Sequence, residues 1–203
     1  MLTSGFKRRL FNGTAIGGAA VSIALLSGGA AHAGPEGFQR VLGQFNGGPN
    51  TNGSVTEITQ TTQTGLIQWT GGFNIDDGET VIFYQPDTAA VTVNHDISGV
   101  LSNIDGNLNS CLATCADVGG NVWIINPSGV TFGPNAVVNV GGLLATTSEV
   151  DVNDLRANFR VGTVQFDGNS PGEVAVLSGA QITGQDSVLA FIAPTVRLSL
   201  IHI

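Results

Sequence analysis

The sequence has little charge, and positive charge is the scarcest. Only 11% of its 203 residues are charged, with fifteen Asp and Glu against seven Lys and Arg. Three of the basic residues fall within residues 1–33, so residues 34–203 hold four basic and fifteen acidic side chains, a formal net charge of −11. Such a chain repels nucleic acid and anionic membrane surfaces, so neither is expected as a partner.

A strongly apolar run of the ~20 residues that a membrane span needs is missing from residues 1–33, which instead have the three parts of a secretory signal peptide. The basic end is formed by Lys7, Arg8 and Arg9. Residues 15–30 are apolar and uncharged, and Ala31 and Ala33 occupy the A-x-A positions of a cleavage site. We expect cleavage after Ala33 and a mature chain of one domain that starts at Gly34. An uncleaved anchor helix is the alternative.

The sequence has only two cysteines, Cys111 and Cys115. Their C-x-x-x-C spacing is not the C-x-x-C of redox motifs, and their neighbourhood lacks the two further ligands that a structural metal site needs. Because an exported chain lives in an oxidising compartment, we expect a local disulfide between them. No metal and no cofactor is expected.

Common catalytic motifs are missing too. The sequence has no P-loop, no G-x-S-x-G and no glycine-rich calcium nonapeptide. Asp76, Asp77 and Glu79 are the best candidates for catalytic carboxylates, but Asp-Asp-Gly between two strands is ordinary turn chemistry. His95 has no Cys or Ser partner at a motif spacing. We therefore predict no catalytic residue.

The sequence is instead rich in glycine, with 29 residues, and in Val, Ile, Thr and Asn. This composition favours short strands, and no window of residues 34–203 has apolar residues at i, i+3, i+4 and i+7 over three turns. Strands are predicted within residues 55–75 and at residues 80–84 and 90–94. The irregular residues 34–60 are expected to form an N-terminal cap.

The stretch VWIINPSGVTFGPN, residues 122–135, is cut by regularly spaced bends. One bend fits a type I turn, with Asn first, Pro second and Gly fourth: Asn126, Pro127, Ser128 and Gly129. Further bends follow at residues 133–135, 141–142 and 148. Three sides and three corners thus take about 22 residues, the size of one solenoid coil. A second coil follows, with bends at residues 178–179, 184–185 and 194. We predict an all-β fold, a single-stranded, three-sided parallel β-helix.

Two segments resemble a known family. NVWIINPSGVTFGPNAVVNVGGLLATTSEV resembles the hallmark of the filamentous haemagglutinin N-terminal domain, also called the two-partner secretion (TPS) or haemagglutination activity domain. GLIQWTGGFNIDDGETVIFYQPDTAAVTVN resembles the upstream half of the same domain, and together they cover most of residues 38–195. The resemblance implies a right-handed parallel β-helix with an N-terminal cap and extra-helical hairpins, at the front of a long secreted exoprotein.

In that family the domain directs the export of the exoprotein from a Gram-negative bacterium. It is recognised in the periplasm by a dedicated outer-membrane barrel, a TpsB-type transporter with POTRA domains, and folding outside helps to draw the chain through. Asn126, Pro127 and Gly129 match the family's N-P-N-G motif, with Ser128 in place of the second Asn. The resemblance thus implies that this turn takes part in transporter recognition and that the protein is secreted, to the cell surface or the medium.

The expected organisation is a signal peptide at residues 1–33, a TPS β-helix domain at residues 34–197 and a tail at residues 198–203. The N-P-N-L motif of one subfamily is missing, which indicates the adhesin-type branch. Residues 103–120 are longer than the usual connection and are expected to form a cysteine-pinned hairpin outside the coil. The tail LSLIHI does not resemble the family and is expected to come from a truncated or misread reading frame.

Two other classes of function stay open. One is a glycan-binding adhesin that acts directly on host surfaces, with Trp69 or Tyr84 stacked on sugars, although Trp69 and Trp123 are both expected in the core. The other is a β-helical polysaccharide lyase or hydrolase, which would use carboxylates. Two further acidic residues, Asp151 and Asp154, are expected in a solvated loop, and His202 lies in the tail.

Overall fold

The computed structural model describes residues 34–158, 164–168, 170–185 and 188–199. Every described residue belongs to one compact unit of the chain. Within the described ranges, no helix is long and apolar enough to cross a membrane.

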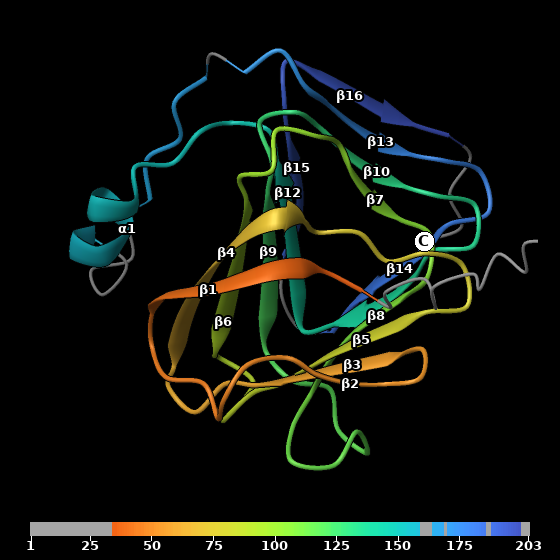
Figure 1. The fold of residues 1–203 in the computed structure, drawn as a ribbon. Helices are drawn as coiled ribbons and strands as arrows, with labels where there is room; N and C mark the ends of the chain where they lie inside the picture. The colour runs from red at the N-terminus through yellow and green to blue at the C-terminus, as the bar shows by residue number, and fades with distance from the viewer. Residues whose placement is uncertain (1–33, 159–163, 169, 186–187, 200–203) are drawn as a thin grey trace, which may run out of the picture. The chain divides into compact units, whose positions relative to one another are not determined.

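Three sheets form the sides of a coil (Figure 1). Sheet 1 contains β1 (Glu36–Leu42), β4 (Thr64–Gly72), β6 (Val91–Asp96), β9 (Asn121–Ile125), β12 (Gly142–Thr146) and β15 (Leu189–Ile192). Sheet 2 contains β7 (Ser102–Ile104), β10 (Val130–Phe132), β13 (Glu173–Val176) and β16 (Thr195–Leu198). Sheet 3 contains β2 (Asn50–Asn52), β3 (Val55–Thr59), β5 (Thr80–Tyr84), β8 (Asn107–Cys111), β11 (Val137–Val140) and β14 (Gln181–Gly184).

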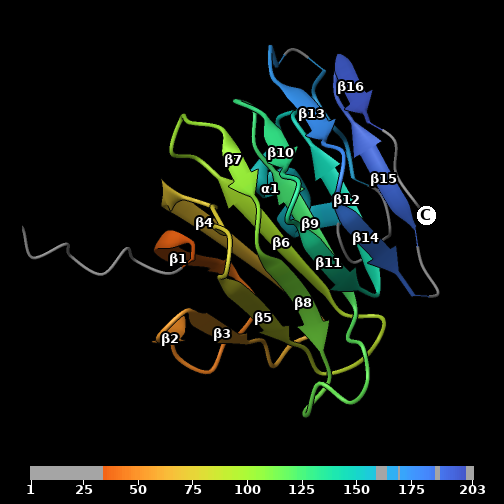
Figure 2. The same cartoon turned by 90° about the vertical axis from the view of Figure 1, so that its right-hand side faces the viewer.

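From β5 onward the chain visits sheets 3, 1 and 2 in turn, so each of these coils adds one strand to each sheet, and the coils stack side by side (Figure 2). The first coil adds β3 and β4 but no strand to sheet 2, where Ile75 forms an isolated parallel bridge with Ile104. From β3 onward all pairings between neighbouring coils are parallel. Asn121 pairs with Gly142, 21 residues later, and Glu173 pairs with Thr195, 22 residues later. The predicted parallel β-helix and its coil of about 22 residues are confirmed.

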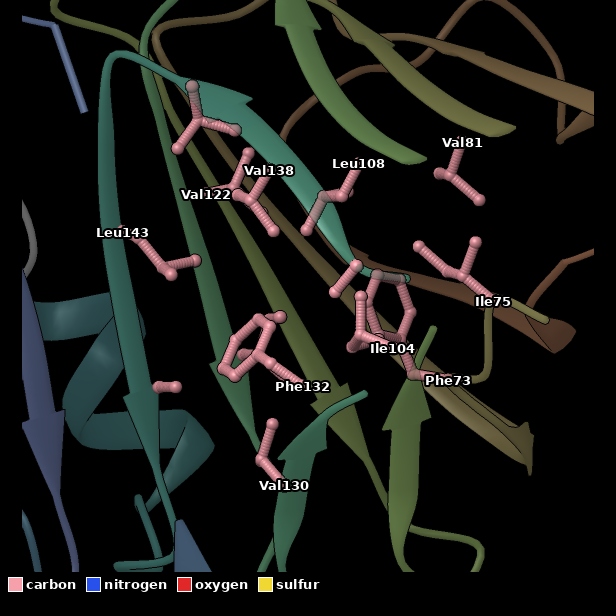
Figure 3. Packing of buried hydrophobic residues seen from close by; sticks show 14 of the residues in the cluster. Phe73, Ile75, Val81, Ile104, Leu108, Val122, Val130, Phe132, Val138 and Leu143 are labelled. Carbon is pink, nitrogen blue, oxygen red and sulfur yellow. The ribbon is translucent and has the colours of Figure 1, made fainter. Parts of the chain in front are cut away.

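Apolar side chains that alternate along the short strands fill the interior of the coil (Figure 3). In the coil that contains the predicted turn, six of them are buried: Val122, Ile124, Val130, Phe132, Val138 and Val140. The polar residues between them face outward, as Thr131 and Asn139 do. Alternation with a period of two therefore decides which side chains form the core.

The N-terminal cap consists of two antiparallel strands. β1 pairs antiparallel with β4 and β2 pairs antiparallel with β3, at the start of an otherwise parallel stack. Phe38 lies edge-on to Trp69 at 5.7 Å and to Phe45 at 5.8 Å, so the cap covers the apolar end of the first coil. The cap was predicted to reach residue 60, but β3 already runs parallel to β5 and belongs to the first coil.

Two excursions leave the coil. After β8, residues 112–120 form a protruding hairpin that carries the Cys111–Cys115 disulfide, and residues 111 and 118 form an antiparallel bridge across it. After β12, the chain leaves sheet 1 and forms α1 (Val152–Asn158) before it returns as β13. The absence of three-turn helical periodicity predicted no helix, and that prediction was wrong for this segment, because a seven-residue helix is too short to show the period.

A second apolar cluster lies on the outer face of sheet 1, where α1 and its flanking residues cover it. Leu155 of α1 is buried there against residues of β4, β6 and β9, namely Leu66, Val93 and Ile125. Trp123 packs half-buried against this cluster and not in the interior. Its predicted place in the core was wrong, because Val122 and Ile124 on either side of it point inward.

Candidate functional site

The turn at residues 126–129 connects β9 of sheet 1 to β10 of sheet 2. The N–H of Gly129 donates to the carbonyl of Asn126 over 3.0 Å, which closes a four-residue turn, and the N–H of Ser128 donates to Asn126 Oδ1 over 2.8 Å. Pro127 supplies a fixed φ at the second position, and Gly129 has a φ of +124°. The corner that the sequence predicts is therefore present.

The side chain of Asn126 points into the protein, where it is fully buried. Its Nδ2 lies 2.8 Å from the carbonyl oxygen of Val100, 2.9 Å from Ser102 Oγ and 3.2 Å from Asp96 Oδ2, and its two hydrogens are shared among these three acceptors. Asp96 is also buried, and its Oδ2 accepts from Phe73 N and Ser102 Oγ as well. This network ties three successive coils together at one corner, because Phe73, Asp96 and Asn126 follow β4, end β6 and follow β9.

Large apolar side chains are exposed beside this corner. Asn126 and Gly129 are buried, Pro127 is half-buried and Ser128 is exposed. Beside them, the connection from β6 to β7 exposes Ile97, Val100 and Leu101 by 44%, 55% and 44%. The other large apolar residues exposed among the described ones are Val137 and four residues at or just before β15 and β16. We name the group Ile97, Val100, Leu101, Pro127 and Ser128 the corner surface.

His95 lies under the corner. It lines a pocket with Pro127, Ser128 and Glu149, its Nδ1 is buried without a hydrogen-bond partner, and its Nε2 lies 3.8 Å from Glu149 Oε2. Burial lowers the pKa of His95, and the carboxylates of Glu149 and Asp96 oppose that shift without reversing it. The short distance between Nε2 and Oε2 alone would favour a charged imidazole. Glu149 is 57% exposed, however, and solvent screens its charge, so the desolvation of His95 determines the direction of the pKa shift.

The acidic residues considered for catalysis lie in a turn and at the start of α1. Asp76 and Asp77 are exposed in a turn, whereas Glu79 is buried and accepts backbone N–H groups. Asp151 Oδ1 accepts the N–H of Asn153 at the start of α1, and Asp154 is exposed in its first turn. Across the described part of the chain, no three His, Cys, Asp or Glu side chains gather where they could hold a metal ion.

The remaining predicted residues fall in three places. Cys111 and Cys115 are joined at an S–S distance of 2.07 Å. Trp69 is fully buried and so cannot stack on a sugar, while the half-buried Tyr84 donates its hydroxyl to Glu57 Oε1 over 3.1 Å. The first two residues of the predicted cleavage site and the tail histidine lie outside the described residues: Ala31, Ala33 and His202.

Sequence reasoning missed the loop at residues 97–101 and the role of Asp96. The apolar residues of ISGVL were the available signal, because they interrupt the polar–apolar alternation between two predicted strands. That the loop lies beside the turn at residues 126–129, about 30 residues later, depends on how the coils stack.

Comparisons with known proteins agree with this architecture. A family model described as the TPS secretion domain matches residues 42–201. Two curated proteins from Haemophilus influenzae, both named heme/hemopexin-binding protein, are 35% and 36% identical over 117 and 94 residues, which are 58% and 46% of this chain. The chain spans only 12% and 9% of their length. The crystal structure of the HMW1 secretion domain from Haemophilus influenzae matches with a TM-score of 0.66 at 25% identity, over 82% of this chain and 41% of that one.

Proposed function

Because the chain belongs to the family of TPS secretion domains, we propose that residues 34–197 are the export domain of a larger exoprotein and that the corner surface docks on its transporter. The partner is a TpsB-type outer-membrane transporter, which reads the domain in the periplasm through its POTRA domains. The family match over residues 42–201 supports the export function, which places the protein at the cell surface or in the medium. Residues 1–33 are proposed to be the signal peptide that brings the chain to the periplasm.

The stacked coils suit the transport of an unfolded chain. In a solenoid each coil contacts only its neighbours, so coils can fold one after another as they emerge. Eight of the eleven parallel pairings between coils involve residues 21 to 30 apart in sequence, such as Asn121 with Gly142 and Val91 with Asn121. A coil that has folded outside cannot return through a pore as a loose chain, so its folding favours export.

The observation that carries the docking proposal is the contrast within the corner. The buried amide of Asn126 and the buried carboxylate of Asp96 fix its base, while three of its exposed side chains are large and apolar: Ile97, Val100 and Leu101. An exposed apolar patch on a rigid support is the kind of surface that binds another protein. The high negative charge elsewhere contributes little to such a contact, because apolar burial depends on area and not on charge.

Secretion of the chain with its cognate transporter tests this proposal. We expect Val100→Asp together with Leu101→Asp to reduce export at least tenfold, because a charge in an apolar contact is costly to bury. The matched control is Val137→Asp, an apolar residue 38% exposed on sheet 3. Both variants should keep the thermal stability of the parent within a few degrees. Normal export of the double variant, or an equal loss in Val137→Asp, would contradict docking at the corner.

The alternatives receive no support from the described residues. The carboxylates considered for a lyase or hydrolase are exposed in turns or bonded to backbone amides, and one of the two aromatic residues considered for sugar stacking is buried. Binding of heme or hemopexin is not part of the proposal, because the matched residues cover only 12% and 9% of the proteins so named.

A further inference from the structure

The nitrogen of Gly34 is held by a buried carboxylate. It donates a hydrogen bond to Glu79 Oε2 over 3.0 Å, and the same oxygen accepts the N–H of Asp76 over 2.9 Å. Gly34 and Pro35 are both buried, so the chain enters the domain through a socket and not along its surface. Glu79 directly precedes β5, so this contact joins the start of the cap to the first coil.

Glu79 has no charged partner among the described residues. It is only 8% exposed, and the two ion pairs in the described ranges are His95–Glu149 and Arg197–Glu173. A buried carboxylate costs several kcal/mol of desolvation unless a cation or several hydrogen bonds compensate it. Here two backbone N–H groups compensate it, and one of them is the N–H of Gly34.

The space around Gly34 in the uncleaved chain favours glycine over residues with a side chain. Gly34 has a φ of +87°, in the left-handed region that other residues avoid. A Cβ at this position would lie 2.9 Å from Thr56 Oγ1 and 3.5 Å from Val81 Cγ2, so β3 and β5 close the space around it. The structure therefore needs glycine at the position that follows the predicted A-x-A cleavage signal.

The surroundings of Gly34 N are negative. The pocket beside it has a volume of about 240 Å³, and its ionisable lining residues are all acidic: Glu36, Asp76 and Glu79. These carboxylates favour a positive charge over a neutral amide in the pocket, and Glu79, the buried one that contacts Gly34 N, is screened least by solvent.

We propose that removal of the signal peptide converts the nitrogen of Gly34 into an ammonium group that pairs with Glu79 and locks the N-terminal cap onto the first coil. Hydrolysis of the Ala33–Gly34 bond by a signal peptidase consumes one water. The C–N bond breaks, Ala33 gains the carboxylate, and the released amine of Gly34 takes up a proton. The uncleaved chain can offer only a neutral N–H to Glu79, so its cap is less stable. This inference rests on the proposed cleavage after Ala33.

The sequence makes the new amine easy to modify alone, because residues 34–203 contain no lysine. Acetylation removes the charge and reproduces an amide at Gly34 N, as in the uncleaved chain. Reductive dimethylation adds a similar bulk but keeps the charge and one N–H. A chain that starts at Gly34 can be released by a protease whose site ends immediately before it, and then unfolded in urea at pH 7.

We expect acetylation to raise the unfolding equilibrium constant at a fixed urea concentration about tenfold, or 1.36 kcal/mol. Dimethylation should change it less than twofold. In Glu79→Gln, which keeps an oxygen for both backbone N–H groups, acetylation should change it less than twofold. The control Glu36→Gln, an exposed carboxylate of the same pocket, should keep the tenfold effect. If Glu79→Gln does not fold, the acetylated and dimethylated parent chains still decide.

Two results would overturn the inference. One is an equal change in the unfolding equilibrium constant of the parent chain after acetylation and after dimethylation. It would show that the bulk of the added group, and not the loss of charge, causes the change. The other is a tenfold effect that persists in Glu79→Gln. N-terminal sequencing of the exported protein provides a separate check, since a start other than Gly34 removes the premise. Transporter-dependent export can survive each of these results, so failure here is distinguishable from failure of the proposed export function.

Discussion

Replacing Asn126 by alanine removes the side chain that joins three coils at the corner. The two amide hydrogens are shared among Asp96 Oδ2, Ser102 Oγ and the carbonyl of Val100, and the side chains of Asn126, Ser102 and Asp96 are at most 1% exposed. A hydrogen bond to a carboxylate contributes about 1.5–3 kcal/mol and a neutral one about 1 kcal/mol. Ser102 and Asp96 keep each other as partners, whereas the carbonyl of Val100 loses its bond. We therefore expect Asn126→Ala to lower the free energy of unfolding by about 3 kcal/mol.

For a domain of this size, that loss corresponds to a fall of about 6–12 °C in the unfolding midpoint. Urea unfolding, followed by circular dichroism and by the fluorescence of the buried Trp69, measures the loss in the free energy of unfolding. Thermal unfolding measures the fall in the midpoint. Ser128→Ala is the matched control, because Ser128 is exposed and only its backbone takes part in the turn, so its effect should stay within about 0.5 kcal/mol. The reasoning is refuted if the two variants are equally stable.

Asn126→Asp separates the loss of the donor from the loss of volume. The substitution keeps the shape of the side chain but replaces the Nδ2 donor by a second carboxylate oxygen, 3.2 Å from Asp96 Oδ2. Like charges so close cannot both be ionised without a large cost, and one proton shared between them relieves it. We expect this variant to be at least as unstable as Asn126→Ala at pH 7.5 and to recover stability relative to it towards pH 4–5. A constant difference between the two variants over this range would count against the corner network.

Two further predictions concern the residues around the corner and the outer cluster. Burial lowers the pKa of His95 below its ordinary value of about 6.5. As the pH falls below 6.5, the unfolded chain therefore binds a proton at His95 while the folded chain does not. The stability due to the neutral His95 is present above pH 6.5 and lost as the pH falls from there; His95→Gln should remove this slope between pH 7 and 5.5, and identical slopes in urea unfolding would contradict it. Leu155→Ala should cost about 2–3 kcal/mol locally, because Leu155 is 1% exposed against sheet 1. Hydrogen exchange should then accelerate in α1 but not in β9 or β10, and uniform acceleration would show that α1 is not a separate cluster.

The sequence determined the local geometry of the coil. Asn, Pro and Gly at the first, second and fourth positions specify the turn at residues 126–129 through their own backbone preferences, and the hydrogen bond from Gly129 to Asn126 is there. Alternating Val, Ile and Phe determined the strands, with residues 80–84 predicted and found as β5. The spacing of the bends set the length of the two coils in which it was seen, where paired residues lie 21 and 22 positions apart.

Only the tertiary structure decided which residues meet across coils. Trp123 lies outside the core, the loop at residues 97–101 lies against the turn of the next coil, and Glu79 lies on Gly34, 45 residues before it. None of these contacts is local, and the separation between stacked residues varies from 21, for Asn121 and Gly142, to 46, for Leu143 and Leu189, because excursions of different length leave the coil. Backbone preferences act over a few residues, so they fix the turns and strands, whereas burial and hydrogen bonding between stacked coils select the partners.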